Sequence, residues 1–348
     1  FVYVIILFLI FRAEIWNFFP FSTLLIQNWS FILIRIENLT KNYGDVKAVQ
    51  SISFSLKDGE VVGFLGANGA GKSTTLKMMT GYLTPTSGNV YVNDQNIIDN
   101  CIDIQKQIGY LPELNPLYFE MKVHEYLKFH AEIRAIKDSD FNDALKRVVK
   151  ECGLQGVVHR TVGNCSKGYK QRIGLAAALI HNPKVLILDE PVTGLDPNQI
   201  VEIRSLIKKL GKEKLVLMSS HILQEIQATV DRIIIIDKGK IVADGTSEEL
   251  ISDSKGITKL ELEILEGNEN DIKNMEATIP NLKVKGINKQ KESVMINTEY
   301  QNSSDPREDI FKYSVENGWI IIGMSVHKRN LEDLFRNLTL DKGSVTDA

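Results

Sequence analysis

Cysteine is scarce in this chain, and the few cysteines lie far apart. Its 348 residues include three, Cys101, Cys152 and Cys165, and none belongs to a CxxC pair. An odd number of widely spaced cysteines fits neither a disulfide framework nor a zinc knuckle. We therefore expect reduced thiols in a cytoplasmic protein.

The sequence also lacks a clear excess of either charge. Its 41 basic and 44 acidic side chains leave a net charge of -3. Without a global basic field, general attraction to nucleic acid or anionic lipid has no support, so no nucleic-acid partner is expected. Any anion must be held by a local site. The length exceeds the usual size of one domain, about 100–150 residues, and predicts about two domains.

Methionine is absent before Met78, although the chain opens with long apolar runs. Residues 1–11 are almost wholly apolar, and residues 15–34 carry no charge, which is just long enough to span a bilayer. Met78 lies beyond the phosphate-binding motif described next. We interpret residues 1–31 as translation of non-coding sequence upstream of a start codon near Ile32 or Leu33. A membrane anchor or an early signal segment is the alternative.

A glycine-rich loop carries the strongest chemical signal. The strand pattern of residues 60–65 runs directly into Gly66, Ala67, Asn68, Gly69, Ala70, Gly71, Lys72, Ser73 and Thr74. A helical pattern follows at residues 73–80, so consecutive backbone N–H groups can curl around phosphate oxygens at a helix N-terminus. Lys72 is placed to reach the β- and γ-phosphates, and the Ser73 hydroxyl to bind Mg²⁺. The loop predicts nucleotide binding, with a simple glycine-rich turn as the alternative.

Two carboxylates follow a second apolar run. Residues 184–189 read as a strand buried on both faces of a parallel sheet, and the run ends in Asp189 and Glu190. Asp189 is placed to hold Mg²⁺ through water, and Glu190 to orient or deprotonate the attacking water. Similar strands at 215–219 and 232–237, separated by helices, predict a mostly parallel sheet covered by helices. Up to this point, the residues support a P-loop nucleotidase but do not identify a narrower family.

One polar stretch narrows the class. Residues 164–172 read NCSKGYKQR and lead into an alanine-rich helix. Here the sequence resembles the ATP-binding subunits of ABC transporters, whose signature is LSGGQ followed by a basic residue. Ser166 and Gly168 match, whereas Cys165, Lys167 and Tyr169 depart from it. The resemblance implies that residues 166–169 bind the ATP held by another subunit. The alternative is that this stretch is only a polar loop that caps a helix.

The remaining motifs of that family occur in the expected order. By this resemblance, Tyr43 stacks on adenine and His221 contacts the γ-phosphate. Glu113 stands in the Q-loop, where many members carry glutamine, and its carboxylate can still coordinate the metal. Asp196 belongs to the D-loop. The resemblance therefore implies Mg²⁺ ligands at Ser73, Glu113 and Asp189, and catalytic groups at Glu190 and His221.

The resemblance covers residues 32 to about 250. It implies an α/β fold, the P-loop NTPase (RecA-like) core of an ABC ATPase, with an antiparallel β subdomain and a helical subdomain at about 115–182. Strand and helix patterns in residues 257–340 predict a small α+β C-terminal domain of βαββαβ order. No catalytic constellation stands out there, and we expect a regulatory or dimer-stabilising role.

The function implied is ATP hydrolysis that energises a separate membrane permease. One P-loop and one signature require pairing, most simply as a homodimer bound to ABC-2 type permease subunits at the cytoplasmic face of the bacterial inner membrane. The phrases at 110–118, 165–169 and 194–199 look most like the gliding-motility-associated subunit, with a generic ABC-2 or multidrug exporter as the alternative. A soluble ABC-type translation factor or repair clamp is disfavoured, because the chain has neither a second P-loop nor sustained heptads. A regulatory module without hydrolysis is disfavoured because Glu190 and His221 are both present.

Overall fold

The structure is a computed structural model that describes residues 32–253, 257–265, 267–290, 293–301, 305–327 and 331–339. The interpretation of residues 1–31 falls outside these ranges. Within them, three sheets form, with the orders β2-β1-β4-β5, β10-β9-β3-β8-β7-β6 and β12-β13-β11-β14. No helix in these ranges is both long enough and apolar enough to cross a membrane.

The six-stranded sheet is the centre of the first and larger part of the fold, residues 32–253, which we call the main core. Its strands are β3 (Val61–Leu65), β6 (Ile108–Leu111), β7 (Val185–Leu188), β8 (Leu215–Ser220), β9 (Arg232–Asp237) and β10 (Lys240–Gly245). All neighbours pair in parallel except β10, which is antiparallel to β9. Every residue of β3, β7 and β8 is buried.

Alternate residues of these strands belong to two different hydrophobic clusters. Leu186 and Leu188 pack in one cluster, and Val185 and Ile187 in the other. Successive side chains of a strand point to opposite faces. Both faces of the sheet are therefore covered, which explains why its strands read as continuous apolar runs.

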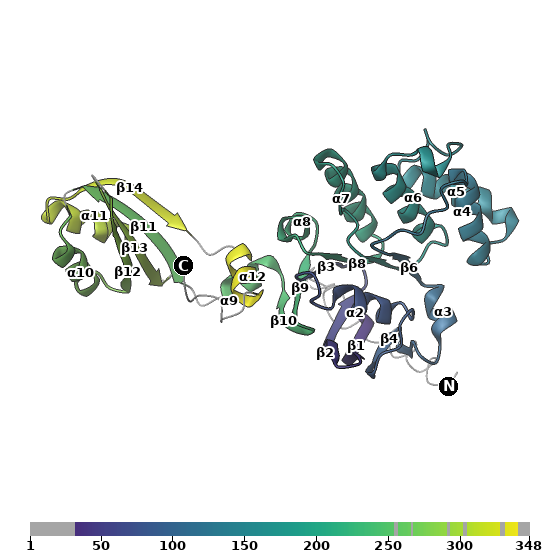
Figure 1. Ribbon diagram of the computed structural model, residues 1–348, viewed down its shortest axis with the longest axis horizontal. Coiled ribbons are helices and arrows are strands. Elements are labelled where there is room, and N and C mark those ends of the chain that lie inside the picture. Colours follow the sequence, from purple (N-terminus) through teal and green to yellow (C-terminus); the bar gives the residue numbers. More distant parts are fainter. Residues whose placement is uncertain are drawn as a thin grey trace, which may run out of the picture. The chain divides into compact units, whose positions relative to one another are not determined.

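An antiparallel sheet covers one face. It consists of β1 (Ile32–Tyr43), β2 (Val46–Lys57), β4 (Ser87–Val92) and β5 (Gln95–Asn96). With helix α2 (Lys72–Met79) it shares the hydrophobic cluster that contains Val185 and Ile187. The rings of Phe54 and Phe64 stack across this contact with centroids 5.8 Å apart. This is the expected antiparallel β subdomain (Figure 1).

Helices cover the opposite face. They are α4 (Val123–Ile133), α5 (Asp138–Glu151), the 3-10 turn η2 (Val162–Asn164), α6 (Lys167–Leu179), α7 (Pro197–Gly211), α8 (Leu223–Gln227) and α9 (Ser247–Asp253). Helix α3 (Cys101–Gln105) instead buries Ile104 in the cluster of the antiparallel sheet. Helices α4, α5 and α6 pack on one another, and α6 contacts β6 at the edge of the sheet (Figure 1). They form the helical insertion that we expected at about 115–182.

A second set of elements follows the core. In chain order they are β11 (Ile257–Leu265), α10 (Glu269–Thr278), β12 (Leu282–Lys289), β13 (Val294–Gln301), α11 (Arg307–Glu316) and β14 (Ile320–His327). This is the expected βαββαβ order, and the strand order is that of a ferredoxin-like sheet. Among the described residues, its hydrophobic cluster, which includes Leu260, Ile310 and Trp319, has no member from the main core.

The last helix does not belong with this small sheet. Helix α12 (Leu331–Thr339) contacts α8, α9 and β9, and Leu331 is fully buried in the helical cluster of the main core. The range that we expected for the small C-terminal domain, 257–340, includes this helix, although its apolar side packs on the main core. The physical reason is the apolar spacing of α12, whose leucines and Phe335 face the core rather than the sheet.

Candidate functional site: a phosphate loop facing two carboxylates

The glycine-rich loop joins β3 to the N-terminus of α2. Gly71 precedes the helix with a φ of 109°, and a Cβ there would lie 2.5 Å from the carbonyl oxygen of Ala48. Only glycine fits this position without a backbone shift. At the start of the loop, the Gly66 N–H donates to the carbonyl of Ser220 at 3.3 Å. The first N–H groups of α2 are thus exposed to a single anion-binding concavity.

Lys72 lies inside this loop with only 6% of its surface exposed. Its ammonium donates to the carbonyls of Gly66 at 2.7 Å and Ala67 at 3.2 Å, and lies 3.5 Å from Glu190 Oε1. A buried ammonium needs such partners. Phosphate oxygens are alternative partners of the same kind, so Lys72 is positioned to exchange loop carbonyls for phosphate.

Asp189 follows the last residue of β7 and is 1% exposed. One of its oxygens, Oδ1, accepts hydrogen bonds from Ser73 Oγ at 3.1 Å and from Ser219 Oγ at 2.7 Å. A hydroxyl beside a carboxylate is an oxygen donor set that suits Mg²⁺. The described residues contain no cluster of three or more His, Cys, Asp or Glu side chains that could hold a metal alone. The pair therefore fits a Mg²⁺ ion that also keeps phosphate and water ligands.

Glu190 occupies a sharp turn with a φ of +50°, which is costly for a residue other than glycine. Its N–H donates to Ser219 Oγ at 2.9 Å, which holds the turn in place. The carboxylate accepts a bond from Thr193 Oγ1 at 3.1 Å and lies 3.0 Å from Nδ1 of His221. The strained turn thus separates two consecutive carboxylates, with Asp189 directed to Ser73 and Glu190 to His221.

A cavity of about 460 Å³ brings together the phosphate loop, Glu190 and His221, while Asp189 lines the adjoining cavity described next. Among the expected site residues, its lining contains Asn68, Gly69, Gly71, Lys72, Ser73, Thr74, Glu113, Glu190 and His221. Gly66 and Ala67 contribute through the carbonyls that hold Lys72, while Ala70 is buried behind the loop. Five sequence segments far apart in the chain, around Ala48, 68–74, Glu113, 190–193 and His221, therefore converge on one polar cavity.

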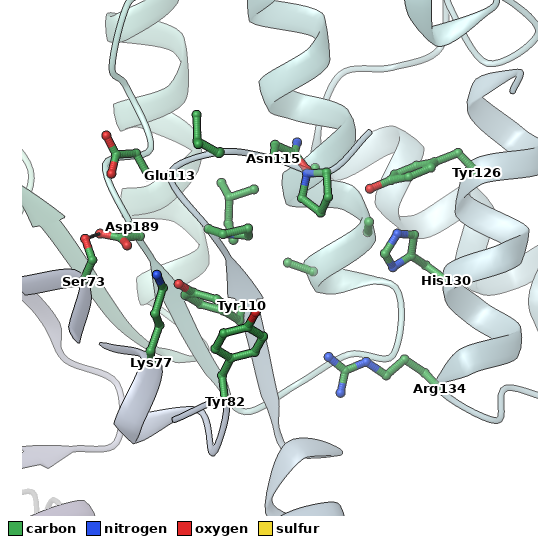
Figure 2. A pocket seen from close by; sticks show the side chains of 17 residues that line it. Ser73, Lys77, Tyr82, Tyr110, Glu113, Asn115, Tyr126, His130, Arg134 and Asp189 are labelled. Carbon is green, nitrogen blue, oxygen red and sulfur yellow. Dashed lines mark hydrogen bonds between the residues drawn. The ribbon is translucent and has the colours of Figure 1, made fainter. Parts of the chain in front are cut away.

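A second cavity, of about 530 Å³, adjoins the first and shares Ser73 and Glu113 with it (Figure 2). Tyr110 lines it, and burial, with smaller contributions from Asp189, Tyr82 and Glu113, raises the pKa of this phenol well above its usual value. The Tyr110 hydroxyl has no hydrogen-bond partner among the described residues. Glu113 thus lies where the phosphate cavity meets this second cavity, a groove beside the helical subdomain.

Cationic and imidazole groups line the far side of this groove. His130 of α4 and Arg134, the residue that caps its C-terminus, face this groove, with Tyr126 beside them (Figure 2). Burial, followed by the charge of Arg134, lowers the pKa of His130, so its neutral form is favoured. Burial raises the pKa of Tyr126 to about 12.

The signature residues lie outside the phosphate cavity, whose lining includes none of them. Ser166 is the N-cap of α6 and accepts a bond from the Tyr169 N–H at 3.4 Å, and Lys167, the first residue of the helix, is exposed. Gly168 lies so close to Gln199 of α7 that a Cβ would be 2.6 Å from its side chain. These residues are therefore not assembled with the P-loop of their own chain.

Two further expected residues are also away from that cavity. Asp196 is the N-cap of α7 and accepts a bond from the Gln199 N–H at 2.9 Å. Tyr43 ends β1 with 48% of its surface exposed, and the ammonium of Lys41 lies 5.5 Å from its ring centroid. An exposed ring with an accessible face suits base stacking.

Two residues were missed in the sequence, Ser219 and Thr193. Ser219 bridges Asp189 and the Glu190 backbone, and Thr193 bonds the Glu190 carboxylate. The sequence could have indicated Ser219, because a hydroxyl at the end of a fully apolar strand needs a buried hydrogen-bond partner. Thr193 had none, since a threonine in a loop is usually a turn residue.

The fold and these contacts define a P-loop nucleoside triphosphatase. Comparison with known proteins makes the class narrower. The ABC transporter family model matches residues 49–193. The bacitracin transport ATP-binding protein BcrA of Bacillus licheniformis is 41% identical over 61% of this chain and 69% of its own length. The linearmycin resistance ATP-binding protein LnrL of Bacillus subtilis (strain 168) is 36% identical over 67% of this chain and 75% of its own.

Solved structures agree with this result. A dimeric bacterial ABC transporter cassette, MJ0796, matches with a TM-score of 0.57 and 25% identity, over 62% of this chain and 98% of that one. The chain belongs to the ABC transporter ATP-binding proteins, and it is an ABC ATPase. The expected fold class is confirmed.

Proposed function

We propose that this chain is the ATP-hydrolysing subunit of an ABC-2 type exporter and energises a separate permease. The single observation that carries the proposal is the cavity in which the phosphate loop meets the Glu190–His221 pair, with Ser73 of its lining bonded to Asp189. The export class is supported by the relatives named for bacitracin transport and linearmycin resistance.

In this proposal, different residues of the site bind the phosphates, the metal and the base. Lys72 and the N–H groups of the loop bind the β- and γ-phosphates, and Ser73, Asp189 and Glu113 hold Mg²⁺. When bound, Mg²⁺ neutralises charge on the phosphate oxygens. Tyr43 stacks on the base. The nucleotide is thereby fixed with its γ-phosphate toward Glu190.

Glu190 acts as the general base. Its carboxylate accepts a proton from the attacking water. His221, whose Nδ1 lies 3.0 Å from this carboxylate, orients it and contacts the γ-phosphate. Thr193 holds the other side of the same carboxylate at 3.1 Å. Because the positive φ of Glu190 fixes its backbone, the base is aimed before substrate arrives.

A second copy completes the site. Ser166, Lys167, Gly168, Tyr169 and Asp196 lie outside their own phosphate cavity, so we assign them to ATP bound by the facing subunit. The dimeric cassette of similar fold supports this pairing. We place the dimer against permease subunits at the cytoplasmic face of the bacterial inner membrane. Residues 32–250 form the ATP-binding domain in this proposal.

A gliding-motility system is the second candidate. Its only support is the resemblance of three short sequence stretches, 110–118, 165–169 and 194–199, to the gliding-motility-associated subunit. The relatives reported above are named for antibiotics, so the export proposal has broader support.

Reconstitution tests the proposal. We expect Mg²⁺-dependent phosphate release by the purified chain, and faster release when a co-expressed ABC-2 type permease is present in vesicles. A strain lacking the gene should become more sensitive to peptide or polyene antibiotics. Loss of surface gliding with unchanged antibiotic sensitivity would instead support the second candidate, and no phosphate release in any condition would refute both.

A further inference from the structure

Helix α12 has an apolar face directed at the main core. Leu331, Leu334, Phe335 and Leu338 follow the i, i+3, i+4, i+7 spacing of one helical face, and all pack on the helical cluster of the core. Leu331 is fully buried there. A nine-residue helix is not stable alone in water, so this packing is what holds α12 in place.

One neighbour of α12 is the helix that follows His221. Helix α8 has only five residues and depends even more on packing. The amide of Gln224 in α8 donates to Glu332 Oε1 of α12 at 3.0 Å. Leu223 and Ile226 of α8 are buried in the same cluster as Leu331. Helix α12 therefore covers and bonds α8.

Helix α8 in turn fixes the backbone on which His221 stands. Ser220 Oγ donates to Glu225 Oε2 of α8 at 2.7 Å and accepts the Ile222 N–H at 3.0 Å. His221 lies between these two residues, with 37% of its side chain exposed. Among the described residues, the Glu190 carboxylate is the only side-chain partner of His221, so the position of the imidazole depends on the backbone to either side.

We propose that α12 is a positioning element of the ATPase site, which holds α8 and thereby keeps His221 directed at Glu190. The small β-sheet domain lies in the chain between α9 and α12, and these two helices contact each other on the core. Both ends of that domain are thus joined to the element that positions His221. The inference rests on the proposed role of His221 in hydrolysis.

A double-mutant cycle tests it in the full chain. Leu331→Asp should displace α12 and lower kcat about fivefold or more, equivalent to about 1 kcal/mol of coupling, while ATP affinity is kept because Lys72 is remote from α12. In a His221→Ala background the same substitution should cause no further loss. Arg336→Asp, which alters an exposed position of the same helix, is the matched control and should leave kcat unchanged.

Two additional measurements cover misfolding and the role of His221. If Leu331→Asp also abolishes ATP binding, Phe335→Ala replaces it in the cycle, because it places no charge in the core. Amide hydrogen exchange should become faster in residues 222–227 of the displaced variant and stay unchanged in α2.

Two results would overturn the inference: an equal fractional loss of kcat with and without His221, or unchanged hydrogen exchange in α8. Wild-type kcat in His221→Ala alone would refute the proposed role of His221, and the exchange result would still decide whether α12 holds α8.

Discussion

Asp189 and Glu190 are neighbours in sequence but have different surroundings. Asp189 continues the strand direction and accepts two serine hydroxyls, whereas Glu190 turns away at a φ of +50° toward His221. Both are nearly fully buried, yet each has polar partners that satisfy its oxygens. In the proposed mechanism, this backbone turn separates the carboxylate that would hold the metal from the one that would serve as base.

Lys72 gives the first prediction at this scale. Lys72→Ala removes an ammonium placed for two charge-assisted bonds to phosphate, each worth about 1.5 kcal/mol or more, so ATP affinity should fall about 100-fold or more. Turnover should become undetectable while the fold survives. Titration calorimetry measures the affinity. Lys77→Ala, on the same helix but lining the second cavity, should bind ATP almost normally (Figure 2), and near-normal binding by Lys72→Ala would contradict the assigned role.

Glu113 gives the second prediction. Glu113→Gln keeps a side-chain oxygen acceptor and should largely preserve nucleotide binding. Glu113→Ala should bind ATP but lose stimulation by the permease, because Glu113 lines both the phosphate cavity and the adjoining groove. Phosphate release with and without permease in vesicles measures this. Full stimulation of the alanine variant would show that Glu113 is only a loop residue.

Among elements, the loop after α6 carries a pH-sensitive contact. His181 Nε2 lies 3.2 Å from the carbonyl of Ile108 at the start of β6, and burial, followed by the charge of Arg134, lowers the pKa of His181 from 6.5 to about 4. The neutral ring is the form that the fold accommodates. It joins the helical subdomain to the edge strand of the parallel sheet.

The third prediction follows from the sign of this shift. The unfolded chain binds the His181 proton near pH 6.5, whereas the folded chain resists it down to about pH 4. The stability contribution is therefore complete above about pH 6.5 and is lost as the pH falls toward 4. Urea unfolding at pH 7.5 and pH 5 should show a smaller loss of unfolding free energy in His181→Gln than in the wild type. An equal or larger loss would exclude His181 as a source of acid sensitivity.

Much of the element order could be predicted from sequence, because each segment's pattern reflects local burial. The buried strands near Asp189 and the helix after Gly71 agree with the structure. The placement of α12 could not be predicted, since an amphipathic helix shows that it packs but not against what. The bond of Thr193 could not be predicted either, because it depends on a strained turn at Glu190 that no local pattern indicates.

For the whole molecule, the arrangement of the site implies an assembly. The P-loop cavity and the residues at the N-termini of α6 and α7 belong to one chain but do not meet in it. A helix N-terminus capped by Ser166 offers N–H groups to an anion that its own chain does not bring there. A facing copy would bring that anion, as bound ATP.

The fourth prediction concerns the chemistry of this assembly. Glu190→Gln keeps the size and a hydrogen-bonding oxygen but cannot accept a proton at neutral pH, so hydrolysis should fall about 10²-fold or more. ATP binding should survive, because Lys72, Ser73 and Asp189 are unchanged. Single-turnover phosphate release measures the rate. A rate within a few fold of wild type would assign the base to another group.

Light scattering of the Glu190→Gln protein with ATP and Mg²⁺ tests the central claim most directly. With ATP trapped, Ser166 and Gly168 of one copy should bind the γ-phosphate on the other, and the protein should become dimeric only when ATP is present. Glu190→Gln with Ser166→Arg should stay monomeric, because the arginine side chain obstructs the facing phosphate. An equally stable ATP-dependent dimer in the double variant would contradict the account, since the signature residues would then not act across the interface.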